Sequence, residues 1–244
     1  LVAEYSRRFG VYDDLMPVLS MSLGAGETTV MRMVTGYSML ANGGRRVKPT
    51  LIDRIQDRWG KTIFKHDDRQ CDTCASDKWT DQNEPRLKDN RELVIDPMSA
   101  YQITSIMQGV IQRGTATGIK GELGRQYVAG KTGTTNDSKD VWFVGYSANI
   151  AVGVYMGYDR PRSLGDSATA GQYAAPIFKD FMKVALRGQP DTPFKIPTGM
   201  KLIRVSASSG QRASGGDAIM EAFKPGTAPP DGIPSFGGGA SAAS

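Results

Sequence analysis

The sequence GKTGTTND at positions 130–137, followed closely by VWFVGY at positions 141–146, decides the fold of this chain. Two short runs of this kind, separated by a few polar residues, are typical of paired antiparallel strands. Lys131 gives the first strand an ammonium group, and the threonines beside it add hydroxyl groups. Gly133 leaves no side chain in the way of a peptide lying alongside the strand. We therefore expect an edge strand suited to binding the carboxylate of a peptide.

This strand belongs to a predicted three-stranded meander. The three runs that alternate or remain apolar between short polar turns are 128–135, 141–147 and 150–157. Strict alternation within the first run puts Thr132 and Thr134 on one face and Lys131 on the other. The lysine is therefore expected to reach the site from beneath the strand.

Helical periodicity predicts three helices around this sheet. The first follows the possible cap Thr28-Thr29 and stops at Asn-Gly-Gly in positions 42–44. The second opens at Asp96-Pro97 and ends at Gly114, and the third follows Pro176. The sequence thus predicts an α/β fold of the α+β type, with an antiparallel sheet packed by helices.

Composition divides the 244 residues into one domain and a tail. We expect a domain over 1–188, in which 48–64 forms a small hairpin and 65–91 is an exposed polar excursion. The tail, 189–244, is rich in Gly, Pro, Ser and Ala, which predicts disorder except for a brief ordered piece near 201–205. The net charge of +5 is scattered, without aromatic residues between the basic ones, so no nucleic-acid partner is expected.

Several further short sequence segments lie before and after the Lys-Thr-Gly motif. They are Leu23-Gly24, Glu27-Thr28-Thr29, residues 36–44, 108–110, 113–116 and 174–178. From about Leu23 to Leu186 the chain resembles the transpeptidase domain of class A, bifunctional penicillin-binding proteins. The resemblance implies a serine β-lactamase/D,D-transpeptidase-like fold, incomplete at its N-terminus. It also implies acyl transfer on D-Ala-D-Ala stem peptides, which β-lactams mimic.

Site roles are carried over only onto the matching residues. The resemblance implies that Lys131 binds the substrate carboxylate and orients a serine, and that the Thr134 backbone N–H forms half of an oxyanion hole. It makes Thr132, Gly133 and Thr135 substrate-binding residues. No metal and no cofactor is expected.

Two of the family's three motifs are missing. No serine of the chain is followed by a lysine three positions later, as the nucleophile motif Ser-x-x-Lys requires. Ser147-Ala148-Asn149 matches Ser-x-Asn, but it follows the Lys-Thr-Gly motif instead of preceding it and falls at a predicted turn. The chain also starts at Leu1 without a signal or transmembrane segment. We interpret it as the C-terminal portion of a longer protein.

The resemblance also implies a setting for the parent protein. An N-terminal transmembrane anchor and a glycosyltransferase domain would precede this portion at the periplasmic face of the bacterial cytoplasmic membrane. Its partners would be peptidoglycan stem peptides, β-lactams and a cell-wall synthesis complex. The alternatives are a fragment of a serine β-lactamase or D,D-carboxypeptidase, and a noncatalytic fold remnant.

The remaining reactive side chains lie in the excursion. His66, the only histidine, is expected to be a surface residue and not a triad member. Cys71 and Cys74 form a single Cys-x-x-Cys. In a periplasmic setting a local disulfide is favoured, with free thiols or a zinc site as alternatives.

The absent nucleophile motif gives a direct prediction. This polypeptide should form no covalent adduct with a fluorescent penicillin, because Lys131 cannot replace the acylated serine. The measurement is in-gel fluorescence after boiling in detergent. A labelled band would show that a serine of this chain is the nucleophile.

Overall fold

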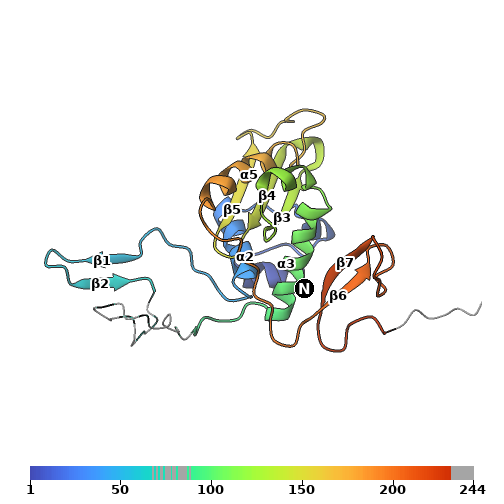
Figure 1. Ribbon diagram of the computed structural model, residues 1–244. Helices are drawn as coiled ribbons and strands as arrows, with labels where there is room; N and C mark the ends of the chain where they lie inside the picture. Colours follow the sequence, from blue (N-terminus) through green and yellow to red (C-terminus); the bar gives the residue numbers. More distant parts are fainter. Residues whose placement is uncertain are drawn as a thin grey trace, which may run out of the picture.

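The computed structural model describes residues 1–67 and 89–231, and between them residues 69, 71, 74, 78, 81 and 87. Figure 1 shows a central sheet with helices around it, one hairpin that projects from this body and a second hairpin that lies beside a helix. The helices are α1 (Val2–Arg8), α2 (Val30–Ala41), α3 (Pro97–Gln112), α4 (Lys120–Leu123) and α5 (Ala174–Ala185). The 3-10 helices are η1 (Leu19–Leu23), η2 (Thr117–Ile119) and η3 (Asn136–Ser138). The strands are β1 (Arg54–Gln56), β2 (Thr62–Lys65), β3 (Ala129–Thr134), β4 (Asp140–Tyr146), β5 (Ala151–Gly157), β6 (Lys201–Ser206) and β7 (Ala218–Phe223).

The predicted meander is present. Strands β3, β4 and β5 form an antiparallel sheet in the order β3-β4-β5, so β3 lies at one edge. The register pairs Ala129 with Tyr146 at one end of β3 and Thr134 with Val141 at the other. The prediction of an antiparallel sheet packed by helices is confirmed.

One face of the sheet packs against α5. The rings of Phe143 and Phe178, from β4 and α5, lie 4.6 Å apart between centroids, and both side chains are fully buried. Gly145 permits this approach, because a Cβ there would lie 2.9 Å from the Phe178 ring and 2.7 Å from the Ala129 carbonyl oxygen. The apolar stripe of α5 is thereby buried on the sheet.

The opposite face packs against α2 and α3. The buried Tyr146 hydroxyl lies 2.7 Å from Thr104 Oγ1, and Thr104 also donates to the Ala100 carbonyl within α3. Over β5, Gly153 lets α2 come close, because a Cβ there would lie 2.5 Å from the Val34 side chain. The sheet is therefore the middle layer between α5 and the α2–α3 pair.

The helix boundaries follow the predicted signals. Thr29 Oγ1 accepts the Arg32 N–H at 3.2 Å and caps α2. Asp96 accepts the Ser99 N–H at 2.9 Å and caps α3, with proline at its first position. The third helix begins at Ala174, two residues before Pro176. Only the start of α5 differs from the expectation.

The predicted hairpin between α2 and α3 is β1–β2. Beyond it, the described residues of the 65–91 excursion are mostly exposed, His66 among them, as predicted. Cys71 and Cys74 are joined by a disulfide, so the favoured alternative for this pair is confirmed.

The predicted disorder of 189–244 is wrong for most of 189–231, whereas the brief ordered piece expected near 201–205 is present as β6. Strands β6 and β7 form a hairpin along α3, with Lys224 Nζ 2.8 Å from Asp96 Oδ2 and Arg113 Nη2 2.7 Å from Glu221 Oε1. Phe194, ahead of this hairpin, is buried and packs edge-on against Tyr146 at 5.5 Å. Composition indicated disorder because it does not register the contacts that α3 and the sheet supply. Residues 232–244 lie outside the described residues.

Among the residues that the structure describes, no helix has both the length and the apolar character required to cross a bilayer.

The buried Tyr146 predicts a pH dependence. Burial raises the pKa of its hydroxyl above the ordinary value of 10.0, so the stability it contributes is present below pH 10.0 and is lost as the pH rises beyond it. The free energy of unfolding should fall by up to about 1.4 kcal/mol per pH unit more steeply in the wild type than in Tyr146→Phe. Urea unfolding followed by circular dichroism, from about pH 8 to about pH 11.5, measures the free energy of unfolding of both proteins across the range in which tyrosine titrates. Equal slopes would contradict the assignment.

Candidate functional site

The C-terminal half of β3 is an accessible sheet edge. Ala129 and Gly130 are buried beside α3, whereas Lys131 and Thr134 are exposed. On its other side β3 pairs with β4 only. An extended peptide could therefore add to this half of the strand through its backbone.

A hydrogen bond at the end of the strand fixes the direction of its backbone groups. The Thr135 N–H donates to the Asp140 carbonyl at 3.0 Å, toward β4. Because successive residues of a strand direct these groups to opposite edges, the N–H and C=O of Thr134 and Thr132 face away from β4. The Lys131 ammonium bends to this same edge and donates to the Thr132 carbonyl at 2.7 Å. The Lys131 ammonium and the outward N–H groups of Thr132 and Thr134 thus lie on the same edge.

Lys131 carries a positive charge that the surrounding residues leave unneutralised. Within the part of the chain that the structure describes, it makes no ion pair with a carboxylate, whereas nearby Lys139 lies 3.4 Å from Asp137. An ammonium group of this kind is suited to a carboxylate brought by a ligand.

The two threonine hydroxyls lie on the α5 face of β3 and contact two other segments. Thr132 Oγ1 lies 2.7 Å from Thr115 Oγ1, in the loop after α3. Thr134 Oγ1 accepts the Ala170 N–H at 3.1 Å, from the loop before α5. As a hydroxyl can accept and donate at once, Thr134 still has a proton to donate. The site therefore lies where three distant segments of the chain meet.

The face of β3 that carries Lys131 also carries a pair of aromatic rings. Trp142 pairs with Gly133 across the strands, and its ring lies 4.8 Å from that of Tyr155 on β5. The Tyr155 hydroxyl donates to Asp140 Oδ1 at 2.8 Å, and this hydrogen bond raises the pKa of the tyrosine. A Cβ on Gly133 would make only an ordinary contact with Trp142, at 3.4 Å. Packing therefore does not require this glycine.

The turn after the motif is closed by Thr135. Its Oγ1 accepts the Asp140 N–H at 2.8 Å, and the next turn residues, Asp137 and Ser138, have φ of 60° and 50°. Left-handed residues other than glycine cost free energy and are found often at functional sites. The hydroxyl of Thr135 is thus engaged by the turn, and its assignment to substrate binding stays a prediction.

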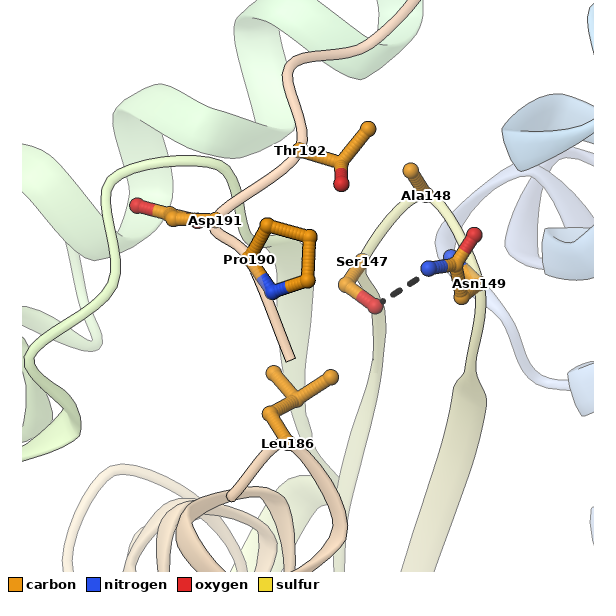
Figure 2. A pocket seen from close by; sticks show the side chains of 7 residues that line it. All are labelled: Ser147, Ala148, Asn149, Leu186, Pro190, Asp191 and Thr192. Atoms are coloured by element: carbon orange, nitrogen blue, oxygen red, sulfur yellow. Dashed lines mark hydrogen bonds between the residues drawn. The ribbon is translucent and has the colours of Figure 1, made fainter. Parts of the chain in front are cut away.

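Ser147 lies at the far end of β4, in the turn before β5. Its hydroxyl accepts the N–H groups of Asn149 and Ile150, both at 3.3 Å, which confirms the predicted turn. Figure 2 shows the residues that line a small pocket beside it: Ser147, Ala148, Asn149, Leu186, Pro190, Asp191 and Thr192. The Asp191 carboxylate is already used by the Gln126 N–H at 2.7 Å. This pocket is separate from the Lys131 edge.

Comparison with known proteins identifies the family. The profile of the penicillin binding protein transpeptidase domain matches residues 17–183, well over half of the chain. The chain belongs to the penicillin-binding protein transpeptidase family. A relative named penicillin-binding protein 1A, from Rickettsia bellii, is 46% identical over 225 residues, which are 91% of this chain and 28% of the relative. The chain thus spans less than a third of that transpeptidase-family relative.

Solved structures of the same family share the fold. Penicillin-binding protein 1A from Haemophilus influenzae superposes with a TM-score of 0.76 at 29% identity, covering 93% of this chain and 37% of that one. The PonA1 protein from Mycobacterium tuberculosis, in complex with penicillin V, gives a TM-score of 0.61 at 22% identity, covering 80% of this chain and 52% of its own. At that identity PonA1 supports the penicillin-binding protein fold alone.

The structure places the predicted residues Lys131, Thr132 and Thr134 along one edge of β3. It also brings residues from two other segments into contact with them. The sequence did not indicate Thr115 or Ala170, whose contacts with β3 depend on how loops distant in the chain pack. The available signal for Thr115 was its place in the 113–116 block that resembles the family. Trp142 lay in the quoted strand but was not assigned to the site.

The contact between Thr134 and Ala170 gives a stability prediction. Thr134→Val would leave the N–H of the fully buried Ala170 without its acceptor, so the free energy of unfolding should fall by about 1–3 kcal/mol. Thr134→Ser retains the oxygen and should retain most of that stability. Urea unfolding measures both variants. A stability of Thr134→Val near wild type, or a loss in Thr134→Ser as large as that in Thr134→Val, would contradict the role given to the hydroxyl oxygen.

Proposed function

We propose that this chain is part of a serine-type D,D-transpeptidase that cross-links peptidoglycan stem peptides and is acylated by penicillins. The observation that carries the proposal is the β3 edge, where the Lys131 ammonium and the outward backbone groups of Thr132 and Thr134 meet on an exposed strand. Membership of the transpeptidase family supports the same reaction class.

The proposed reaction is acyl transfer in two steps. A serine of a Ser-x-x-Lys motif, supplied by the remaining length of the parent protein, attacks the carbonyl carbon of the penultimate D-Ala. The peptide bond to the terminal D-Ala breaks, its nitrogen takes up a proton, and D-Ala leaves. An amine of a neighbouring stem peptide then attacks the serine ester, which forms the cross-link and regenerates the hydroxyl. Penicillin would acylate the same serine by opening its lactam ring.

The β3 residues would bind the donor and stabilise its charge. The substrate lies as an extra strand along the open edge, with its terminal carboxylate at the Lys131 ammonium and at the Thr132 and Thr134 hydroxyls. The outward Thr134 N–H donates to the carbonyl oxygen as negative charge develops there, a contact typically worth about 3–4 kcal/mol of the barrier. Gly133 leaves room for the peptide backbone, and Thr135 maintains the turn that ends the strand.

The same proposal includes the cellular setting. The parent protein would act at the periplasmic face of the cytoplasmic membrane, held by an N-terminal anchor, with a glycosyltransferase domain ahead of this portion and with cell-wall synthesis partners. The name of the Rickettsia bellii relative and the share of it that this chain spans support a longer parent of this kind.

Lys131 provides the test of the proposed function. In the parent protein, Lys131→Ala should slow acylation by a fluorescent penicillin by about two to four powers of ten, as expected when a preorganised electrostatic group is removed. Lys139→Ala is the matched control, because Lys139 lies in the connection between β3 and β4, beyond the end of β3, and pairs with Asp137. Stopped-flow or quenched gel labelling gives the rates.

The rank order of variants sharpens this test. Thr134→Val keeps the backbone N–H and loses only a hydroxyl. The free-energy barrier to acylation should therefore rise by roughly 1.5–3 kcal/mol, the value of one hydrogen bond to a charged group. Rates must be compared under conditions where each variant is folded. An acylation rate near wild type for Lys131→Ala would contradict the proposed role and leave the lysine structural.

A further inference from the structure

The β1–β2 hairpin is exposed on both faces. Every residue of β1 and β2 is exposed, and Figure 1 shows the hairpin projecting away from the sheet and helices. Its own turn holds its shape, because Asp57 Oδ1 accepts the N–H groups of Trp59 and Lys61, both at 2.9 Å. A two-stranded hairpin alone in water is only marginally stable. An additional contact would stabilise it.

The hairpin carries large apolar side chains in solvent. Trp59, at the tip, is 78% exposed, and Ile63 in β2 is 64% exposed. Ile55 and Phe64 are cross-strand partners and form an exposed apolar pair on one face. Clustered exposed apolar groups of this kind mark sites of interaction with proteins or membranes.

Basic residues surround these apolar groups. Residues 50–66 contain four Lys or Arg and two Asp, and one of these acids, Asp57, is engaged by the turn. Arg54 and Lys65 are direct cross-strand partners, an arrangement of like charges that is unfavourable without an anion nearby. Neither of them makes an ion pair among the residues that the structure describes, although Asp67 interacts electrostatically with Lys65. The hairpin is therefore complementary to an anionic surface.

We propose that the β1–β2 hairpin binds the headgroup region of an anionic phospholipid bilayer. Trp59 and the apolar side chains would lie at the boundary with the acyl chains, and Arg54, Lys61 and Lys65 would extend to the phosphates. A folded protein partner would cover one face of the hairpin. A bilayer interface surrounds the tip and both faces, which matches the exposure of every strand residue. This membrane contact goes beyond acyl transfer and does not depend on it.

Vesicle co-sedimentation with the purified 244-residue chain tests the proposal. Binding to vesicles of phosphatidylcholine with phosphatidylglycerol should exceed binding to pure phosphatidylcholine by about tenfold or more, and should weaken as salt is added. The charge variant Arg54→Gln with Lys65→Gln and the apolar variant Trp59→Ala with Phe64→Ala should each lower the affinity for anionic vesicles by about tenfold.

The β6–β7 hairpin supplies matched controls. It too exposes basic residues on a strand, Lys201 and Arg204, and apolar residues, Leu202 and Met220. Lys201→Gln with Arg204→Gln, and Leu202→Ala with Met220→Ala, should leave vesicle binding unchanged. Far-UV circular dichroism should show all four variants folded alike, because the substituted side chains are exposed.

Three results would overturn the proposal. They are equal binding to neutral and anionic vesicles, equal loss in the β6–β7 controls, and binding to purified peptidoglycan sacculi but not to vesicles. The last result would assign the hairpin to an anionic glycan. Hydrogen exchange gives an independent readout, since anionic vesicles should slow exchange in residues 54–65 and leave the β6–β7 hairpin unchanged.

Discussion

The hydrogen bonds between Thr135 and Asp140 fix the orientation of β3, and the proposed chemistry depends on that orientation. Once the Thr135 N–H points to β4, alternation turns the backbone groups of Thr134 and Thr132 toward solvent. A shift of one residue in this pairing would turn these groups toward β4 and move every side chain to the opposite face. The backbone and hydroxyl of Thr135 both hydrogen-bond with Asp140 and so contribute to this register, while its assignment to substrate binding stays a prediction.

The two faces of the sheet keep this register in place. Phe143 and Phe178 bury one face, while Tyr146 with Thr104 fixes the other to α3. A slipped strand would place Tyr146 on the α5 face, without the hydroxyl partner it has on α3. The loops that follow α3 and precede α5 then reach the Thr132 and Thr134 hydroxyls from these same two layers. The packing of the core on both faces of the sheet therefore also determines the geometry of the β3 edge.

Local signals predicted the elements that depend on short-range physics. The caps at Thr29 and Asp96, the meander and the β1–β2 hairpin all follow from residues within a few positions of one another. Contacts such as Thr115 with Thr132 join loops far apart in the chain, and no local pattern encodes them. The error over 189–231 has the same origin: Phe194 and Glu221 are ordered by partners in the sheet and in α3 that composition cannot indicate.

Contacts between the β6–β7 hairpin and α3 connect the last described strands of the chain to the β3 edge. At the start of α3, Lys224 donates to the Asp96 side chain. Midway along the helix Gln102 donates to the Ala222 carbonyl, and at its end Arg113 pairs with Glu221. Thr115 follows two residues after the last of these contacts. The hairpin also lies beyond the 17–183 span that matches the family profile. A domain boundary drawn at the end of that span would agree with the family profile, yet it would remove the hairpin that contacts α3 along its length, and α3 packs directly against β3.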